Sequence, residues 1–286
     1  RYAIYAGVLI GLAVLTKGPV GLLIPILAFL VYLLMTRFRF LPKLKEFLLL
    51  ALMVLVVSSA WYGVELIKNG PWFLAEFIKY QVELFSQPVA DHQQPFYYHF
   101  VVVLLGCFPM SVLALPGFRK KYVEDAMARW MMILFWVVMI LFTIVTTKIV
   151  HYSSLSYLPL SFIAATVMTS LMDNNERLSG WVKGIYLFIG TVLGLLLTLL
   201  PLINHFKESI IPLINDPFAV AGIQKPVPWG GYEFLFGVVF LLAVALSFIY
   251  LVRNQYLRSI TTMAIGTAYV LMMYLIFALP KIEAHT

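Results

Sequence analysis

The segment Tyr2–Met35 reads YAIYAGVLIGLAVLTKGPVGLLIPILAFLVYLLM, and its only charged residue is Lys17, which separates two apolar runs. Both runs are apolar enough for bilayer helices, although they are short for a hydrocarbon core of about 30 Å. Similar runs recur along the whole chain. Of its residues, 62% are hydrophobic and only 12% are charged, whereas about a quarter are charged in soluble domains. The composition therefore predicts an all-α, polytopic helical membrane protein.

About nine transmembrane helices are expected, because the apolar runs are long and show no alternation of polar and apolar residues. Their predicted ranges are Tyr2–Thr16, Val20–Met35, Phe47–Val64, Phe96–Leu115, Trp130–Thr147, Ser153–Leu171, Gly184–Ile203, Tyr232–Leu251 and Ile260–Leu279. We expect these helices to form a single transmembrane domain over residues 1–286.

The basic residues of the loops predict the orientation of the helices. All arginines fall in one set of alternate loops, whereas the other set carries only lysines. Short loops rich in Lys and Arg stay in the cytoplasm, so the lysine-only set is expected to face outward. Four connections lie on that outer side: a turn at Lys17, the segment Glu65–Pro95, a turn near Lys148–Tyr152, and the segment Asn204–Glu233.

The outer segment Glu65–Pro95 contains a predicted helix. Its sequence PWFLAEFIKYQVELF starts after Asn69-Gly70 and places Glu76, Lys79 and Glu83 on one face. We expect an amphipathic helix that lies in the outer membrane interface.

Lys17 and Gly18 form the first candidate site. One interpretation is a lysine whose amine reaches the lipid headgroups while its stem stays in lipid. The other is an anion site, because Gly18 permits a close approach to the backbone and the next helix begins with free N–H groups. At this depth a lipid phosphate is the obvious anion.

Two further candidates lie in the outer connections. In TTKIVHYSSLSYLP, Lys148 and His151 would share a face if the turn is helical, and with Tyr152 they would contact a phosphate; the alternative is an ordinary interfacial loop. The pair Asp91-His92 is either part of a solvated loop or a contact for substrate or a divalent metal. No cofactor is required by the sequence, and His92 is the residue that a metal would use.

Several classes of protein are disfavoured. No carboxylate lies in the middle of a predicted span, which argues against a transporter coupled to protons or sodium ions. There is no nucleotide-binding loop and no nucleic-acid motif, and a single cysteine, Cys107, excludes an internal disulfide. The polar residues gather on the outer side instead, which favours recognition or chemistry there with a substrate that resides in the membrane.

Three separated motifs, LAVLTKGPVGLLIP, DHQQPFYYHFVVVLLGCFPMS and TKIVHYSSLSYLP, together resemble family 39-type glycosyltransferases. These are the bacterial relatives of protein O-mannosyltransferases and of the lipid A aminoarabinose transferases, with a GT-C fold. The resemblance implies a polyprenyl-phosphate-linked sugar donor and an inverting transfer to a lipid, glycan or protein acceptor. It further implies an integral protein of the bacterial inner membrane with its active face outward.

The resemblance also implies roles for single residues. Lys17 matches the lysine that is expected to contact the lipid phosphate. His92 lies in the loop that contributes to the donor site and, in some members, to a metal site. Lys148 and His151 match the basic turn that is expected to face the cavity. The family's catalytic acid lies in the first outer loop, which is expected upstream of Arg1. The chain is thus expected to be N-terminally truncated, without any C-terminal soluble domain and inactive alone, and no catalytic base is named.

Three other interpretations stay open. A transporter or flippase of a lipid-linked sugar would use the same phosphate site without cleaving the donor. A GT-C-like ligase or polymerase of oligosaccharides generally depends on outer arginines, which are not predicted here. The last alternative is a purely structural membrane subunit.

Overall fold

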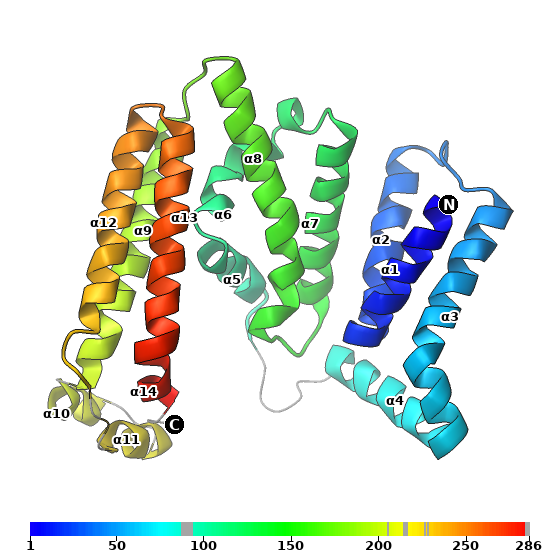
Figure 1. Ribbon diagram of the computed structural model, residues 1–286, viewed down its shortest axis with the longest axis horizontal. Helices are drawn as coiled ribbons and strands as arrows, with labels where there is room; N and C mark the ends of the chain where they lie inside the picture. Colours follow the sequence, from blue (N-terminus) through cyan, green and yellow to red (C-terminus); the bar gives the residue numbers. More distant parts are fainter. Residues whose placement is uncertain (87–93, 205, 214–216, 226, 228, 284–286) are drawn as a thin grey trace. The chain divides into compact units, whose positions relative to one another are not determined.

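The computed structural model describes residues 1–286 except for 87–93, 205, 214–216, 226, 228 and 284–286. Over the described residues the chain consists of helices and their connections, without a β-strand (Figure 1). The prediction of an all-α fold is confirmed. The helices pack into two compact units, one formed by Arg1–Gly106 with Gly117–Ile163 and the other by Cys107–Pro116 with Ala164–Thr286.

Within the described residues, six helical segments are long and apolar enough to cross a membrane: Leu44–Asn69, Ala126–Ile144, Val150–Asp173, Gly180–Leu202, Phe234–Val252 and Tyr256–Glu283. Two shorter apolar helices, Tyr2–Lys17 and Val20–Met35, precede them. These eight segments match eight of the predicted runs, and the chain is an integral membrane protein.

The expectation of one continuous helix over Phe96–Leu115 is wrong. The segment forms two helices, α5 (Tyr98–Gly106) and α6 (Met110–Leu113), with a break between them. Pro109 lies in this break, and its missing N–H cannot extend the hydrogen-bond ladder of α5. The uninterrupted apolar composition of the run concealed the break.

In the first unit, α1 (Tyr2–Lys17) packs between α2 (Val20–Met35) and α3 (Leu44–Asn69). Gly7 and Gly11 allow the close approach of α1 to α3, because a Cβ atom at either position would collide with α3. The helix α2 packs on α7 (Ala126–Ile144), and Ile24, Ala28 and Val138 lie in the buried core between them. A 3-10 helix, η4 (Val150–Ser156), then leads into α8 (Tyr157–Asp173).

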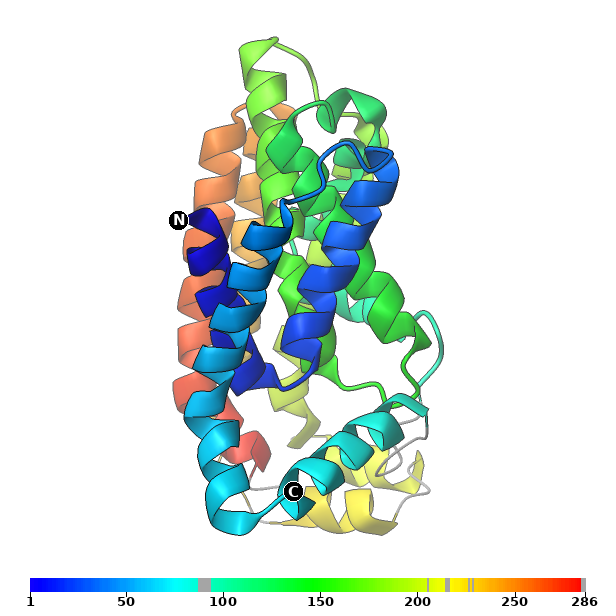
Figure 2. The same cartoon turned by 90° about the vertical axis from the view of Figure 1, so that its right-hand side faces the viewer.

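The amphipathic helix predicted after Gly70 is present as α4 (Trp72–Ser86). Gly70 ends α3 with a positive φ of 76°, which glycine adopts readily, and the chain turns there. Figure 2 shows α4 crossing the end of the first unit below the α1–α2 turn. Its location in the outer interface remains a prediction.

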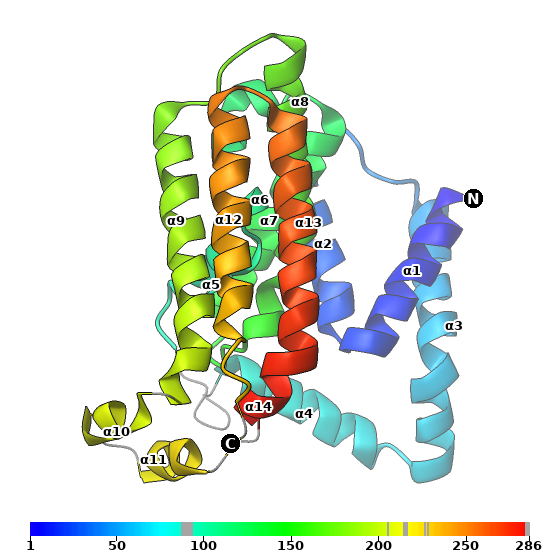
Figure 3. The same cartoon turned by 60° about the vertical axis from the view of Figure 1, so that its left-hand side comes forward.

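In the second unit, α9 (Gly180–Leu199), α12 (Phe234–Val252) and α13 (Tyr256–Met273) run side by side (Figure 3). A π-helical turn, Tyr274–Ala278, continues α13 into α14 (Leu279–Glu283). In the described part of the predicted loop Asn204–Glu233, α10 (Lys207–Ile210) and the 3-10 helix η6 (Ile211–Leu213) precede α11 (Pro217–Gln224).

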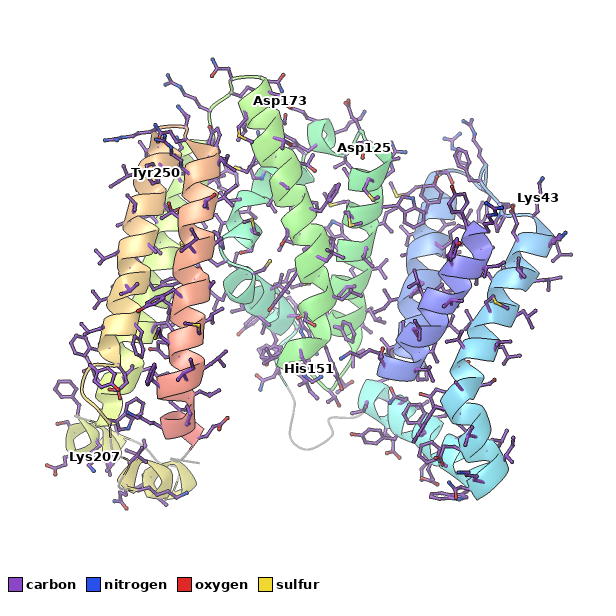
Figure 4. All side chains as sticks on the ribbon, in the orientation of Figure 1. Lys43, Asp125, His151, Asp173, Lys207 and Tyr250 are labelled. Carbon is purple, nitrogen blue, oxygen red and sulfur yellow. The ribbon has the colours of Figure 1, made fainter. Side chains whose placement is uncertain are left out.

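Within each unit, the connections lie at the two ends in the alternating order predicted from the sequence. In the first unit, Lys43 and Asp125 lie at one end and His151 lies at the other (Figure 4). In the second unit, Asp173 and Tyr250 lie at the end opposite Lys207 (Figure 4). Connections assigned to the same side of the membrane therefore share an end within each unit, while the side that faces outward remains a prediction.

Candidate functional site

A cavity of about 790 Å³ lies within the first unit, between α1, α2, α4, α7, η4 and the start of α8. Most of its lining is apolar: Ala13, Val20, Gly21, Ile24, Pro25, Leu84, Phe85, Leu134, Phe142, Val145, Leu155 and Leu158. The polar lining residues are Lys17, Gln81, His151, Tyr152 and Ser154. Among the described residues, Lys17 is the only lysine, arginine or carboxylate in the lining.

The polar residues gather at one end of the cavity. Along α7 the lining runs from Leu134 to Val145, a distance of about 16 Å at 1.5 Å per residue. Val145 follows the last residue of α7, close in the chain to His151 and Tyr152. Away from that end, the α7 wall is apolar. A cavity with a polar end and a long apolar wall suits an amphiphilic molecule.

Lys17 is the last residue of α1, and its side chain is exposed. Within the described part of the chain, no hydrogen bond or ion pair involves its ammonium group. Gly18 follows with a φ of 64° and is buried, because the ring of Phe77 on α4 lies against it. The close approach that Gly18 was expected to permit is therefore made by another segment of the chain.

The helix α4 brings Gln81 to the cavity. One attachment of α4 is the contact between Phe77 and Gly18. Another is at its C-terminal end, where the N–H groups of Thr146 and Thr147 donate to the carbonyls of Phe85 and Leu84 at 3.2 and 3.3 Å.

Gln81 is not among the site residues predicted from the sequence. A retrospective signal is its position four residues after Phe77, which places both side chains on one face of the helix.

Lys148 and His151 would share a face only in a helical turn, and Lys148 is not part of a helix. The helix η4 begins only at Val150, and Ile149 before it is extended, with φ −118° and ψ 139°. The exposed His151 lines the cavity, whereas the buried Lys148 does not.

Lys148 is only 7% exposed, and its Nζ donates to the carbonyl of Val145 at 2.8 Å. Val145 itself lines the cavity, so the ammonium group lies directly behind the wall. Among the described residues, no carboxylate forms an ion pair with Lys148. The predicted second cation thus contacts a residue of the cavity wall but does not line the cavity itself.

Tyr152 is half-buried and lines the cavity. Its ring packs on Phe142 and His151, with centroid separations of 5.3 and 5.1 Å. The structure gives its hydroxyl group no hydrogen-bond partner within the described ranges. This hydroxyl and the ring nitrogens of His151 are available to a ligand at the polar end.

His92 and Asp91 lie outside the described residues. The described part of the chain holds no group of three His, Cys, Asp or Glu residues that would bind a metal ion. The roles suggested for His92 in metal or substrate binding therefore remain predictions.

No protein-family model matches the chain. It is 28% identical to an uncharacterized protein of Aquifex aeolicus over 83% of this chain and 46% of that protein. It is 26% identical to the undecaprenyl phosphate-alpha-4-amino-4-deoxy-L-arabinose arabinosyl transferase of Pectobacterium atrosepticum, over 78% of this chain and 43% of that enzyme. The corresponding transferase of Aeromonas salmonicida is 27% identical over 63% of this chain and 34% of the enzyme. The chain thus spans less than half the length of these relatives.

The fold is similar to that of ArnT from Cupriavidus metallidurans. The structure of ArnT bound to undecaprenyl phosphate matches with a TM-score of 0.65 and 21% identity, over 96% of this chain and 47% of ArnT. The apo structure of the same protein matches with a TM-score of 0.60 and 19% identity. The predicted resemblance is therefore confirmed: the chain is similar in sequence to aminoarabinose transferases, and its fold is similar to the GT-C-type fold of ArnT.

Proposed function

We propose that this chain forms the lipid-phosphate-binding part of a glycosyltransferase. The enzyme transfers a sugar from a polyprenyl-phosphate-linked donor to a lipid, glycan or protein acceptor at the outer face of the bacterial inner membrane. The observation that carries the proposal is the apolar cavity with Lys17, Gln81, His151 and Tyr152 at one end. The sequence similarity of the chain to transferases named for undecaprenyl phosphate-linked aminoarabinose supports the same proposal.

The lining matches the two chemical parts of such a donor. The isoprenoid tail would lie along the apolar wall formed by residues of α2 and α7, where it would gain van der Waals contacts and meet no unpaired polar group. The phosphate would lie at the polar end, where Lys17 supplies a positive charge and Gln81 an amide donor. Tyr152 adds a hydroxyl donor.

The buried Lys148 adds to the positive potential at this end. Removing an ammonium ion from water costs several kcal/mol unless an anion or hydrogen bonds compensate it. Among the described residues only the carbonyl of Val145 does so. A phosphate placed in the cavity beside Val145 would supply the missing negative charge at short range.

This arrangement suits the departure of a phosphate from a sugar. As the glycosidic bond to the phosphate breaks, the leaving oxygen gains negative charge. Cations fixed beside that oxygen stabilise the transition state more than the ground state. One such contact in a water-poor site is worth about 3 kcal/mol, by analogy with an oxyanion-hole donor. The base that activates the acceptor is not assigned to a residue of this chain.

The test is the binding of undecaprenyl phosphate to the chain in lipid nanodiscs. We expect Lys17→Ala to weaken binding at least about tenfold, because a charge-assisted hydrogen bond is lost, and Lys17→Arg to retain most of it. Lys79→Ala is the matched control, since Lys79 is an exposed lysine of α4 outside the cavity lining. The uncharged alcohol undecaprenol should bind all variants equally weakly. Wild-type affinity in both Lys17 variants would contradict the proposal.

A transporter or flippase of the same lipid would pass this binding test. The two functions differ in the fate of the donor, because only the transferase breaks the bond between sugar and phosphate. The full-length protein with a labelled donor and acceptor should therefore release free polyprenyl phosphate. Movement of the intact donor across a vesicle membrane, without release, would favour the transporter.

A further inference from the structure

We propose that His99 is a positioning residue that fixes the phosphate-binding end of the cavity through Ser153; this inference rests on the proposed function. His99 is fully buried on α5, and its Nδ1 lies 3.0 Å from the Oγ of Ser153 in η4. The pair joins two segments that are 54 positions apart in the sequence. His99 does not line the cavity, so it acts on a ligand only through the residues that it holds.

The helix η4 has two faces with different roles. Ser153 and Ser156 are fully buried, and the Oγ of Ser156 donates to the carbonyl of Ser153 at 2.6 Å. His151, Tyr152 and Ser154 line the cavity. Because side chains three residues apart lie on the same face of a 3-10 helix, the bond at Ser153 ties this buried face of η4 to α5 and so sets the rotation of η4. That rotation decides where the imidazole and phenol groups point at the polar end.

Two further contacts connect α5 with the cavity wall. The ring of His99 lies 6.0 Å from that of Phe142, and Phe142 packs on Tyr152 in turn. Two helical turns further along α5, Gly106 lies so close to the hydroxyl of Tyr157 that a Cβ atom would not fit. The helix α5 therefore braces η4 and the start of α8 at two points.

The second ring nitrogen shows that His99 is not placed for packing alone. Its Nε2 is buried and has no hydrogen-bond partner among the described residues. A buried polar atom without a partner is destabilising, and a phenylalanine would fill the same space without that cost. The bond from Nδ1 to Ser153 is the interaction that an apolar residue would not provide.

Substitutions of His99 by residues with an amide side chain can distinguish the roles of its two ring nitrogens. The amide of Asn reaches about as far as Nδ1 of histidine, whereas the longer amide of Gln reaches about as far as Nε2. We would measure binding of undecaprenyl phosphate to His99→Asn, His99→Gln and His99→Phe in nanodiscs. We expect about fivefold or greater weakening for Gln and Phe, and a change within about twofold for Asn, because a hydrogen bond to Ser153 survives only in Asn.

Ser153→Ala removes the same bond from the other side. We expect it to weaken binding as much as His99→Phe does, and the double variant to be no weaker than either single variant, since the two residues share one interaction. If a His99 variant unfolds, the affinity of Ser153→Ala alone tests whether the bond matters for lipid binding, because this substitution removes only one oxygen atom.

Three results would overturn the inference. Normal binding by His99→Phe and Ser153→Ala, with wild-type protein binding well, would refute positioning while leaving the proposed function intact. Recovery by Gln instead of Asn would show that Nε2 acts and that the route through Ser153 is wrong. Failure of the wild-type protein to bind the lipid would overturn the proposed function and this inference with it.

Discussion

The ring of Phe77 lies against the α-carbon of Gly18, where an added Cβ atom would come within 2.8 Å of the ring carbon Cζ. This contact fixes α4 over the turn that presents Lys17. It also places Gln81, one turn further along α4, at the polar end of the cavity. The glycine of the predicted phosphate motif thus has a packing role that the sequence pattern did not reveal.

Gly18→Ala is expected to weaken the binding of undecaprenyl phosphate as well as stability. Gly18 has φ 64° and ψ −150°, a region that glycine alone adopts readily, so alanine adds about 1–3 kcal/mol of strain and also displaces Phe77. Gly70→Ala is the matched control, because Gly70 has φ 76° and ψ −178° with no atom within 4 Å of the added Cβ. The control should lose stability but keep its affinity. Equal losses of affinity would show that the Phe77 contact does not matter.

Lys148→Met is expected to separate stability from binding. Removing a buried ammonium that lacks a carboxylate partner among the described residues should leave the unfolding temperature unchanged or raise it. Affinity for undecaprenyl phosphate should fall about tenfold if its charge acts on the phosphate. Lys79→Met, at an exposed position, serves as the control. A large loss of stability with normal affinity would instead assign Lys148 a purely structural role.

Glu233 and Lys281 should contribute strongly to the stability of the second unit. The side chain of Glu233 is 1% exposed; it accepts hydrogen bonds from Lys281 and, at 2.8 Å, from the N–H of Gly230. Glu233→Gln leaves the ammonium without its partner and should lower the free energy of unfolding by about 3 kcal/mol. The exposed pair Glu76–Lys79, at 3.8 Å, is the control, and Glu76→Gln should cost less than about 1 kcal/mol. Thermal melts of the two variants would check this difference.

The same pair predicts a dependence of stability on pH. Burial acts to raise the pKa of Glu233, but hydrogen bonds from Lys281 and Gly230 outweigh it and hold the pKa below its ordinary value of 4.5. A carboxyl whose pKa is lower in the folded protein stabilises it above the unfolded pKa, and this contribution is lost as the pH falls through the folded pKa. The unfolding temperature should therefore drop below about pH 4.5 in wild-type protein, and by less in Glu233→Gln. An identical drop in both would contradict the prediction.

A buried polar network should stabilise the packing of α9, α12 and α13. The Oγ of Ser247 lies 2.5 Å from the hydroxyl of Tyr186 and 2.9 Å from both the carbonyl and the Oγ of Ser259. Ser247→Ala should lower the free energy of unfolding by about 1 kcal/mol, as interhelical hydrogen bonds in membranes do.

Thr267 on α13 provides the contrast to Ser247. Its buried Oγ1 has no partner among the described residues, so Thr267→Val should be neutral or stabilising. A melting temperature that falls equally in the Thr267 and Ser247 variants would show that the network contributes nothing specific.

The sequence by itself determined the class of fold, and it singled out Lys17, which lines the cavity. Long apolar runs such as Val20–Met35 satisfy their backbone hydrogen bonds within their own segment, so local composition is sufficient to predict them as helices. The isolated charge of Lys17 between two such runs is likewise a local signal. The helix prediction is confirmed because it depends on neighbours in the chain, whereas the role of Lys17 in phosphate binding remains a prediction.

Only the tertiary structure decided which residues meet. The break at Pro109 has a local cause in the proline. By contrast, the position of Gln81 at the cavity, the burial of Lys148 and the bond between His99 and Ser153 are set by tertiary contacts. These features depend on contacts between segments tens of residues apart, and a pattern of hydrophobicity carries no information about such partners. For this reason the apolar helices could be predicted from the sequence, whereas the tertiary structure decides which residues meet at the polar end of the cavity.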